Sequence, residues 1–506
     1  MSQNPKYLIS FDTDQIKNYI FATNSLREIR GASALLVKIE EEREKYLALP
    51  EDAVVYSAGG SGAVEIGSLE EAESLKEKIE FDFQQRTVSG SITAIVVPPE
   101  LDGKKLTFYQ QMKEARKQMQ QTKAAKAPLF QVPSEPYMQP CMACGRLPAE
   151  LKYEDDHSGD LLCQSCSQKR EIGKKVRQSK NEGYVKKFHD YVNNNVTDKD
   201  KANLWDGTEL AKDLTKLAAL DGSGYVGFIM LDGNNMGELL ESIEQKEHYR
   251  QYSDTLKRTV EHLVYEAILK EGKPIQGVLP FEIVLIGGDD VIIFTTAKLA
   301  MPFALAVLKG FEESTDQILE AANIKKDRSK KLTMSAGVVY AHGNFPIPAL
   351  VEIGESLMKN AKAYADQHKR ESGEEVSAID FMLVTGSMFD LETAKEISRA
   401  MRPFTRDSME KLTQHASELD IPASQLHRVY EACVSGRLVD GIMATLQMMG
   451  RLRDGRQRET IKQVLDLFSV IPKEKRALYW PWTRLDGPKK HESILVDLID
   501  LHRFAK

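Results

Sequence analysis

Two adjacent aspartates follow two glycines inside an apolar stretch that runs from Phe281 to Phe294. The β-type residues on both sides predict a hairpin whose turn holds Gly287, Gly288, Asp289 and Asp290. Glycine tolerates unusual backbone angles and lets a bulky anion approach the main chain. Carboxylate oxygens are the ligands that Mg²⁺ prefers. The turn therefore suggests a metal site that handles nucleotide phosphates, although an acidic hairpin turn without chemistry has the same pattern.

A third carboxylate, Asp232, directly follows a predicted strand over 227–231. The next residues, up to Gly237, lead into a helix whose first N–H groups could face phosphate oxygens. In a split β-α-β fold, the first strand and the hairpin are neighbours in one sheet, so Asp232 would lie beside Asp289 and Asp290. Three carboxylates can hold two Mg²⁺ or Mn²⁺ ions, one for an attacking hydroxyl and one for the leaving pyrophosphate.

The expected site therefore has metal ligands and nucleotide contacts. The catalytic metal ligands would be Asp232, Asp289 and Asp290. The nucleotide contacts would be Gly233, Asn234, Asn235, Gly237, Gly287, Gly288 and Lys362. Lys362 lies on a helix predicted over 348–367 and could bring a cation to the triphosphate, although the pattern alone favours a solvated lysine.

The same order of elements, β-α-β-β-α-β, occurs in residues 7–97 and again in residues 225–385, which indicates an internal duplication. The first copy has Asp12 and Asp14 after its first strand, but its hairpin turn is Gly59-Gly60-Ser61-Gly62. Without acids in the turn, this copy lacks a full ligand set and is expected to be catalytically silent. Gly59, Gly60 and Ser61 could still admit a second nucleotide, or the copy could be purely structural.

Four of the five cysteines form two CxxC pairs, Cys141/Cys144 and Cys163/Cys166, separated by 18 residues. This spacing is typical of a four-cysteine zinc ribbon, and four thiolates would leave no open position on Zn²⁺. The zinc would be structural. Cys433 is isolated and is expected in a core.

Composition limits the class of protein. The 506 residues are 42% hydrophobic and 28% charged, which fits a soluble chain of roughly three domains. No run of 18 apolar residues and no signal peptide is seen, and paired cysteines fit a reducing compartment, so we expect a cytoplasmic protein without a membrane partner. The net charge of −7 restricts nucleic-acid contacts to local patches. One candidate patch, the basic run from Lys169 to Lys187, fits a nucleic-acid backbone or, as the more common case, a solvated helix face.

The predicted class is α+β, in four parts. The first split β-α-β domain would span 1–135, the zinc ribbon with a basic helical linker 136–222, the second such domain 223–395 and a helical domain 396–506. A long helical region is expected over 15–47 with a break near Gly31. The C-terminal part is expected to be helical to its end, with Tyr479-Trp-Pro-Trp482 as a buried anchor or a stacking surface.

These motifs, in this order, resemble the large polymerase-like subunit of type III CRISPR effector complexes, closest to the Cmr-type branch. The resemblance rests on Phe11-Asp-Thr-Asp-Gln-Ile-Lys17, Leu26-Arg-Glu-Ile-Arg-Gly-Ala-Ser33, the CxxC pairs, Asp232-Gly-Asn-Asn-Met-Gly237 and the acidic hairpin. It implies two ferredoxin-like palm domains packed face to face. It also implies conversion of ATP into cyclic oligoadenylate messengers in antiviral defence, with guide or target RNA and small CRISPR subunits as partners.

Two features differ from the family. The first palm begins at about residue 6, so the resemblance implies a member without the N-terminal HD nuclease. Asn234 stands where the family often has aspartate, which puts one metal contact or the choice of product in question. Two other functions stay open: a non-catalytic scaffold subunit that binds nucleotide and partners, and a free-standing synthase of another nucleotide signal.

Overall fold

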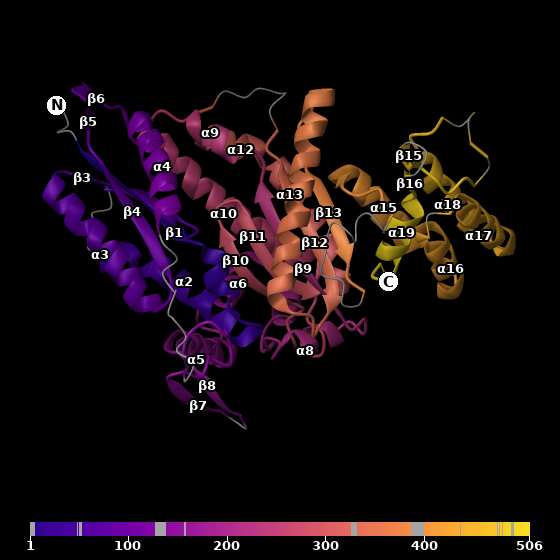
Figure 1. Ribbon diagram of the computed structural model, residues 1–506, viewed down its shortest axis with the longest axis horizontal. Coiled ribbons are helices and arrows are strands. Elements are labelled where there is room, and N and C mark those ends of the chain that lie inside the picture. The colour runs from indigo at the N-terminus through magenta and orange to yellow at the C-terminus, as the bar shows by residue number, and fades with distance from the viewer. Residues whose placement is uncertain are drawn as a thin grey trace.

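The first palm is built on a four-stranded antiparallel sheet with the strand order β2-β3-β1-β4 (Figure 1). Its strands are β1 (Tyr7–Asp14), β2 (Val54–Ala58), β3 (Ser61–Ile66) and β4 (Ser91–Val97). Its helices are α1 (Ile16–Ile20), α2 (Leu26–Tyr46) and α3 (Leu69–Thr87), and after the short hairpin β5 (Glu100–Leu101) and β6 (Lys104–Lys105) comes α4 (Phe108–Ala125).

The second palm repeats this order in a six-stranded sheet, β10-β11-β9-β12-β13-β14. Its strands are β9 (Tyr225–Gly233), β10 (Phe281–Gly287), β11 (Asp290–Thr296), β12 (Met334–His342), β13 (Ala378–Leu383) and β14 (Phe404–Thr405). Its helices are α9 (Met236–Glu241), α10 (Lys246–Glu271), α11 (Ala297–Glu313), α12 (Thr315–Ala321) and α13 (Ile347–Ser372). The predicted α+β class with two ferredoxin-like palms is confirmed.

The duplication extends to irregularities of the backbone. In both hairpins the first strand carries a register shift three residues before its last paired residue, at Val55 in the first palm and at Val284 in the second. A bulge increases the local twist and bends a strand. The two hairpins therefore bend at equivalent positions, and residues of the two palms can be matched one to one.

The expected break near Gly31 is wrong, because the chain breaks between α1 and α2 and Gly31 lies inside α2. A Cβ atom at Gly31 would lie 1.7 Å from the Lys169 carbonyl oxygen, and one at Gly173 would lie 2.0 Å from that of Arg27. Glycine at both positions thus lets α2 cross the helix that carries the second CxxC pair at very short range. Gly31 is therefore a glycine that permits close helix packing, and it does not end the helix.

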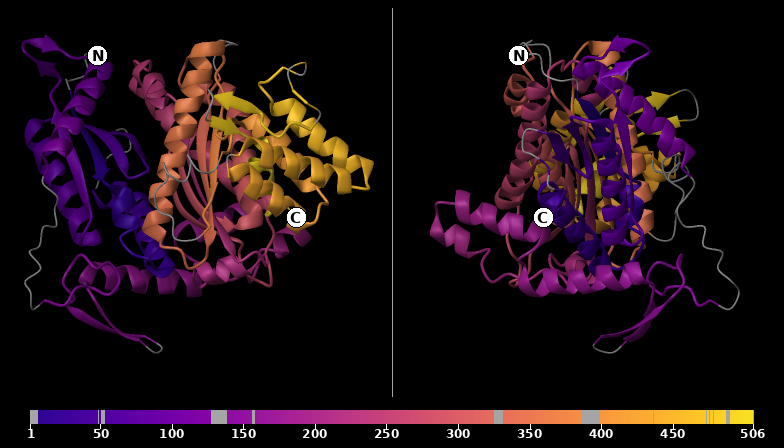
Figure 2. Two further views of the ribbon diagram at one scale, coloured as in Figure 1. Left: turned by 45° about the vertical axis from the view of Figure 1, so that its right-hand side comes forward. Right: turned by 90° about the vertical axis from the view of Figure 1, so that its left-hand side faces the viewer.

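The cysteine module and a helical linker join the palms, and the module projects from one end of the molecule (Figure 2). The module holds the hairpin β7 (Leu151–Asp155) and β8 (Ser158–Leu162), followed by α5 (Gln164–Ser179). The linker helices are α6 (Gly183–Asn195), α7 (Lys199–Asn203) and α8 (Leu214–Ala219).

A buried ion pair joins the two palms. The Arg30 guanidinium on α2 donates to Glu282 of β10 through Nε at 2.8 Å and through a terminal nitrogen at 2.5 Å, and also to the Ala211 carbonyl at 2.8 Å. The two side chains are only 3% and 5% exposed. A bidentate pair of this kind fixes orientation as well as distance.

The open edge of the second sheet, strand β10, is covered by polar contacts from neighbouring helices. Ser33 of α2 donates its hydroxyl to the Val284 carbonyl at 2.6 Å. Tyr184 of α6 donates to the Ile286 carbonyl and accepts from the Ile286 N–H, both at 2.9 Å. Main-chain groups that the bulge and the edge leave without a strand partner are thus satisfied.

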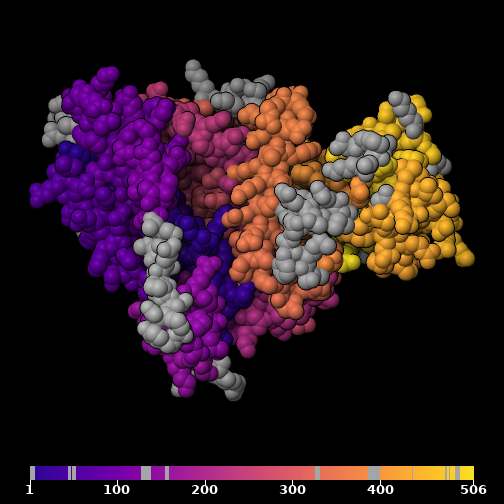
Figure 3. Space-filling view, in the orientation of Figure 1, coloured from indigo at the N-terminus to yellow at the C-terminus, as the bar shows by residue number. Residues whose placement is uncertain are grey.

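The C-terminal part forms a lobe beside the second palm (Figure 3). It contains α15 (Arg406–Glu418), α16 (Ala423–Val434), α17 (Leu438–Arg451), α18 (Gly455–Phe468), α19 (Ile494–His502) and the hairpin β15 (Arg484–Asp486) and β16 (Lys490–Glu492). The expectation of helix to the end of the chain is wrong at this hairpin. Trp482 is fully buried and donates to the Leu438 carbonyl at 3.1 Å, so the buried-anchor alternative is confirmed for this residue.

The computed structural model describes residues 6–47, 49, 53–126, 138–155, 158–324, 331–385, 399–435, 437–472, 474, 476–477, 479–486 and 490–505. Among the helices of these segments, none combines the length and apolar character needed to cross a membrane. The four domain boundaries given above stay predictions.

We predict that Arg30→Ala lowers the free energy of unfolding by about 3–5 kcal/mol, because Glu282 would keep a buried charge without its partner. Denaturant unfolding monitored by tryptophan fluorescence measures the change. Arg116→Ala is the matched control, since its ion pair with Glu241 also joins the palms but is 35% and 52% exposed. That variant should change stability by about 1 kcal/mol or less. Equal effects of the two variants would contradict the role given to Arg30.

Candidate active site

The three aspartates lie at one edge of the second sheet. Leu231 pairs with Val291, so Asp232 at the end of β9 lies beside Asp290 at the start of β11. Gly287 pairs with Asp290, which leaves Gly288 and Asp289 as a two-residue turn, and Gly288 takes the positive φ of 68° that such turns require. The predicted convergence of the three side chains is therefore what the strand register produces.

Gly233 is part of this arrangement because the Asp289 carboxylate lies against it. A Cβ atom at Gly233 would meet Asp289 Oδ2 at 2.5 Å. Any larger residue would push the carboxylate away from the strand end. Gly233 is thus required for the position of Asp289.

The carboxylates repel one another. Burial, and then the charge of Asp232, raises the pKa of Asp289 to about 6. Burial, followed by the charges of Asp232 and Asp289, raises the pKa of Asp290 to about 8. Crowded carboxylates of this kind lack sufficient positive charge around them, and a divalent cation would supply it. The oxygens of the three aspartates are nevertheless more widely spaced than the sulfurs of the four cysteines. Among the described residues, only the cysteines form a group of three or more potential metal ligands whose ligand atoms all lie within 4.8 Å of one another.

Lys362 reaches the site from α13. Its ammonium forms an ion pair with Asp232 Oδ2 and donates to the Gly233 carbonyl at 3.0 Å. It also lowers the pKa of both hairpin aspartates, although less than burial raises it. The structure thus bonds Lys362 to Asp232 at the site, and its contact with a nucleotide stays a prediction.

Asn234 is bonded to strand β12 and not to any of the three carboxylates in the described contacts. Its amide donates to Thr333 Oγ1 at 3.0 Å and accepts from Ser335 Oγ at 2.8 Å, and its N–H donates to the Thr333 carbonyl at 2.8 Å. The side chain therefore secures the end of β9 to the start of β12. Asn235 begins α9 with a positive φ of 56°, and Gly237 has open space around it. Nucleotide contact by Asn234, Asn235 or Gly237 stays a prediction.

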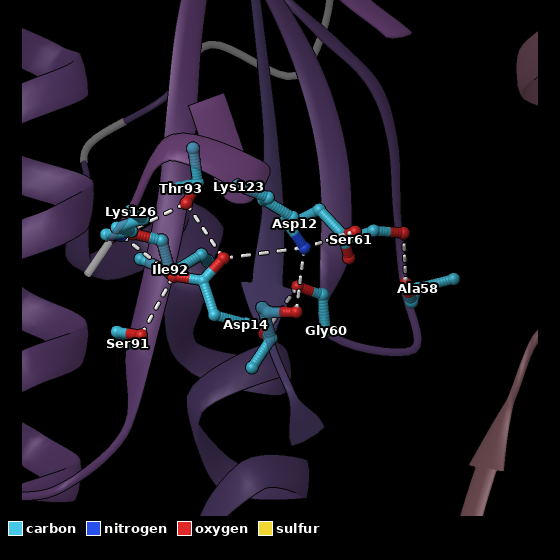
Figure 4. Close-up of polar contacts among 11 residues, drawn as sticks. Asp12, Asp14, Ala58, Gly60, Ser61, Ser91, Ile92, Thr93, Lys123 and Lys126 are labelled. Carbon is cyan, nitrogen blue, oxygen red and sulfur yellow. Dashed lines mark hydrogen bonds and ion pairs between the residues drawn. The ribbon is translucent and has the colours of Figure 1, made fainter. Parts of the chain in front are cut away.

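The first palm contains a matching Asp–Lys pair that the sequence did not reveal (Figure 4). Lys123 of α4 donates to Asp12 Oδ2 at 2.7 Å and to the Thr13 carbonyl at 3.0 Å. By strand register, Asp12 and Thr13 match Asp232 and Gly233, so Lys123 makes the bonds that Lys362 makes in the second palm. A lysine on the long helix that follows β4 in one copy and its equivalent β12 in the other was the available signal.

Asp14 matches Asn234 in the same way. The Asp14 carboxylate accepts hydrogen bonds from the hydroxyls of Ser91 and Thr93, each at 2.8 Å. By strand register, Ser91 corresponds to Thr333 and Thr93 corresponds to Ser335. Lys126 adds a third bond to Asp14 at 2.8 Å. Burial would raise the pKa of Asp14, but the bonds from Lys126, Thr93 and Ser91 outweigh it and lower the pKa.

The Gly59-Gly60 turn of the first palm meets the acidic turn of the second. A Cβ atom at Gly59 would lie 2.9 Å from Gly287 Cα, and Gly59 also has a positive φ of 60°. The Gly60 carbonyl accepts from Thr13, and Ser61 Oγ donates to the Ala58 carbonyl at 3.0 Å. The polar groups of this turn are thus used within the first palm, and a nucleotide at Gly59, Gly60 and Ser61 stays a prediction.

The four cysteines of the CxxC pairs lie together, with all sulfurs within 4.8 Å of one another. Cys144 and Cys163 sulfurs are 3.9 Å apart. Tetrahedral zinc holds its thiolates about 3.8 Å from each other, so the cluster fits Zn²⁺ as a structural ion.

Part of the basic run is not a surface. Lys169 is 1% exposed and donates to the Tyr19 carbonyl at 2.7 Å. Arg170 is buried between Glu28 and Asp160, each at 2.6 Å. For these two residues both expectations, a nucleic-acid-binding patch and a solvated face, are wrong, because their charges join α5 to the first palm.

Comparison with known proteins gives the relationship of the chain. Residues 225–372 match the model of the Cas10/Cmr2 second palm domain. The structure of Csm1 in T.onnurineus superposes with a TM-score of 0.56 at 14% identity, covering 99% of this chain and 70% of that one. A Csm1–Csm4 cassette in complex with AMPPNP gives 0.53 at 16% identity, covering 100% and 70%. The Csm1–Csm4 subcomplex of the type III-A CRISPR-Csm interference complex gives 0.53 at 13% identity, covering 99% and 70%.

No curated protein matches the chain. The resemblance to the large subunit of type III CRISPR complexes is confirmed by the Cas10/Cmr2 palm and by the shared fold. Assignment to the Cmr-type branch stays a prediction.

We predict that Cys163→Ser abolishes zinc binding, because structural zinc needs all four thiolates. Metal analysis of the purified protein should fall from about one zinc per chain to near zero, with a lower melting temperature. Cys433→Ser is the control, since Cys433 is fully buried in the C-terminal lobe and far from the module in sequence. Full zinc content in the Cys163 variant would refute the assignment.

Proposed function

We propose that this chain is a divalent-metal-dependent nucleotidyltransferase that converts ATP into a cyclic oligoadenylate-type signal in antiviral defence. The observation that carries the proposal is the meeting of Asp232, Asp289, Asp290 and Lys362 at one sheet edge of a Cas10/Cmr2-type palm. Three hard-oxygen donors and one cation are the parts that phosphoryl-group transfer needs.

The residues have separate roles in this proposal. Asp232, Asp289 and Asp290 would hold Mg²⁺ or Mn²⁺, and their mutual repulsion favours binding of the cation. The bound ion would lower the pKa of the attacking ribose hydroxyl and offset charge on the departing pyrophosphate. Lys362 would move its ammonium from Asp232 toward the triphosphate when the ion takes over the carboxylate.

The first palm would receive a nucleotide without activating it. Gly60 and Ser61 stand where the second palm has Asp289 and Asp290, and Asp12 and Asp14 are already bound by Lys123 and Lys126. Because its turn has no carboxylate, the described part of this palm lacks the three-acid ligand set of the second palm. It would position the acceptor, while the second palm activates the donor.

Proteins of the same fold support the choice of ligand. The solved Csm1–Csm4 cassettes include complexes with AMPPNP, with pppApA and with cA3. By extension, we infer that this chain also binds ATP, and that it works in the cytoplasm with small CRISPR subunits and guide or target RNA.

We predict that Asp289→Ala/Asp290→Ala lowers product formation at least about 100-fold, since loss of a mere outer-shell partner costs 10–100-fold. Purified protein is incubated with labelled ATP, Mg²⁺ or Mn²⁺ and candidate activating RNA, and products are identified by mass spectrometry. Glu352→Ala, at an exposed position on α13, is the control and should keep activity. Identical products from wild type and the double variant would refute the proposal.

The same assay separates the two other functions. Nucleotide binding without product, together with stable co-purification of small CRISPR subunits, would indicate a scaffold. Product formation without RNA or partner would indicate a free-standing synthase.

A further inference from the structure

Both helices that flank the candidate site lie on one face of the second sheet. Alternation along the strands places Asp232 on the same face as Phe228, and Asp290 on the same face as Phe294. α13 packs on this face, because a Cβ atom at its Gly354 would lie 2.8 Å from the Phe228 ring. α1 of the first palm packs there too, with the Phe21 ring 6.1 Å from Phe228 and 6.5 Å from Phe294.

Lys17 lies on α1 beside the contact between the two turns. Its neighbour Ile16 reaches the first-palm turn, since Ile16 Cδ1 would lie 3.2 Å from a Cβ atom at Gly60. The preceding residue of that turn, Gly59, touches Gly287. Lys17 is therefore placed at the junction of the palms, above the sheet face that carries the carboxylates.

The partner of Lys17 comes from α13. The Lys17 ammonium lies 3.2 Å from Glu355 Oε1, and the two side chains are 26% and 32% exposed. Glu355 and Lys362 are seven residues apart, so they lie on the same side of α13 two turns from each other. Lys17 and Lys362 thus approach the aspartates from two different helices, and both lower the pKa of Asp290.

The charged side chains around the site can be balanced by metal ions that accompany a highly anionic ligand. Four carboxylates, those of Asp232, Asp289, Asp290 and Glu355, face two ammonium groups. One divalent ion would balance the group, and a second would leave it positive. A triphosphate would then find two lysines from two different helices, each held by a carboxylate until the triphosphate arrives.

We infer that Lys17 is a phosphate-binding residue for the nucleoside triphosphate of the second palm, supplied by the first palm and held ready by Glu355. The inference rests on the proposed function and adds to it a residue from the other copy of the duplication. A partly exposed ion pair is weak, so Glu355 can release the lysine to a phosphate at little cost. Because the lysine comes from one palm and the metal ligands from the other, the site is complete only when the palms are packed together.

The competing explanation is that Lys17 and Glu355 merely join the palms. Two substitutions separate these roles, because Lys17→Gln and Glu355→Gln break the same ion pair but only the first removes the cation. A phosphate contact predicts unequal effects, whereas a joining role predicts equal ones. Lys17→Arg keeps the charge and should restore most of the binding.

The test measures the dissociation constant of AMPPNP with Mg²⁺ for the full chain and the three variants by calorimetry. We expect Lys17→Gln to weaken binding about tenfold, since it removes one charge-assisted bond to phosphate. Glu355→Gln should bind as wild type or more tightly, and Lys17→Arg within about threefold of wild type. Adenosine, which has no phosphate, should bind the wild type and Lys17→Gln equally.

Equal weakening by Lys17→Gln and Glu355→Gln, or no weakening by Lys17→Gln, would overturn the inference. Melting temperatures of the variants show whether a loss of binding reflects a loss of folding. If Lys17→Gln is destabilised, the comparison of Lys17→Arg with Glu355→Gln decides, because a joining role predicts weaker binding for Glu355→Gln alone. Because the readout is binding, it is independent of turnover. A wild-type protein that binds AMPPNP but makes no product would refute the proposed function while leaving this result valid.

Discussion

The close approach of two main chains at Gly59 and Gly287 is the constraint on which the arrangement of the palms depends. A side chain on either residue would separate the turns, because a Cβ atom at each would lie 3.0 Å or less from the other glycine. With the turns in contact, α1 of the first palm reaches the sheet face of the second, and α2 covers strand β10. The buried Arg30–Glu282 pair then fixes the angle between the palms. The candidate site is thus a property of the pair of palms.

The two copies keep the same hydrogen-bonded frame and differ in charge. An aspartate at the end of the first strand is held by a lysine in both, as Asp12–Lys123 and Asp232–Lys362. Two residues further along, each palm has a polar side chain that bonds to the neighbouring strand. In the first palm this residue is the charged Asp14, which Lys126 also contacts, and in the second palm it is the neutral Asn234. An aspartate at 234 would add a buried charge beside two hydroxyl partners, Thr333 and Ser335, that carry no charge to balance it. The asparagine therefore keeps the frame and limits repulsion near Asp289 and Asp290.

The order of elements along the chain and the meeting of the aspartates could be predicted, because both follow from alternation and from turn residues within short segments. The Asp12–Lys123 pair joins residues 111 positions apart, and nothing local marks it. Gly31 was misjudged because a glycine that permits helix crossing looks like one that ends a helix. Lys169 and Arg170 were misjudged because their acidic and carbonyl partners lie in distant segments. Long-range charge pairing is thus the part that a single sequence conceals.

The bonds from Ser33 and Tyr184 to strand β10 have a consequence for self-association. β10 is the edge of the second sheet, and its residues from Phe281 to Ile286 are all buried. An apolar edge with free N–H and C=O groups is a template for strand addition by another molecule. In the whole chain α2 and α6 occupy that edge. The first palm and the linker therefore cover this edge. Without them, the second palm would expose an edge strand that could pair with another copy of the chain.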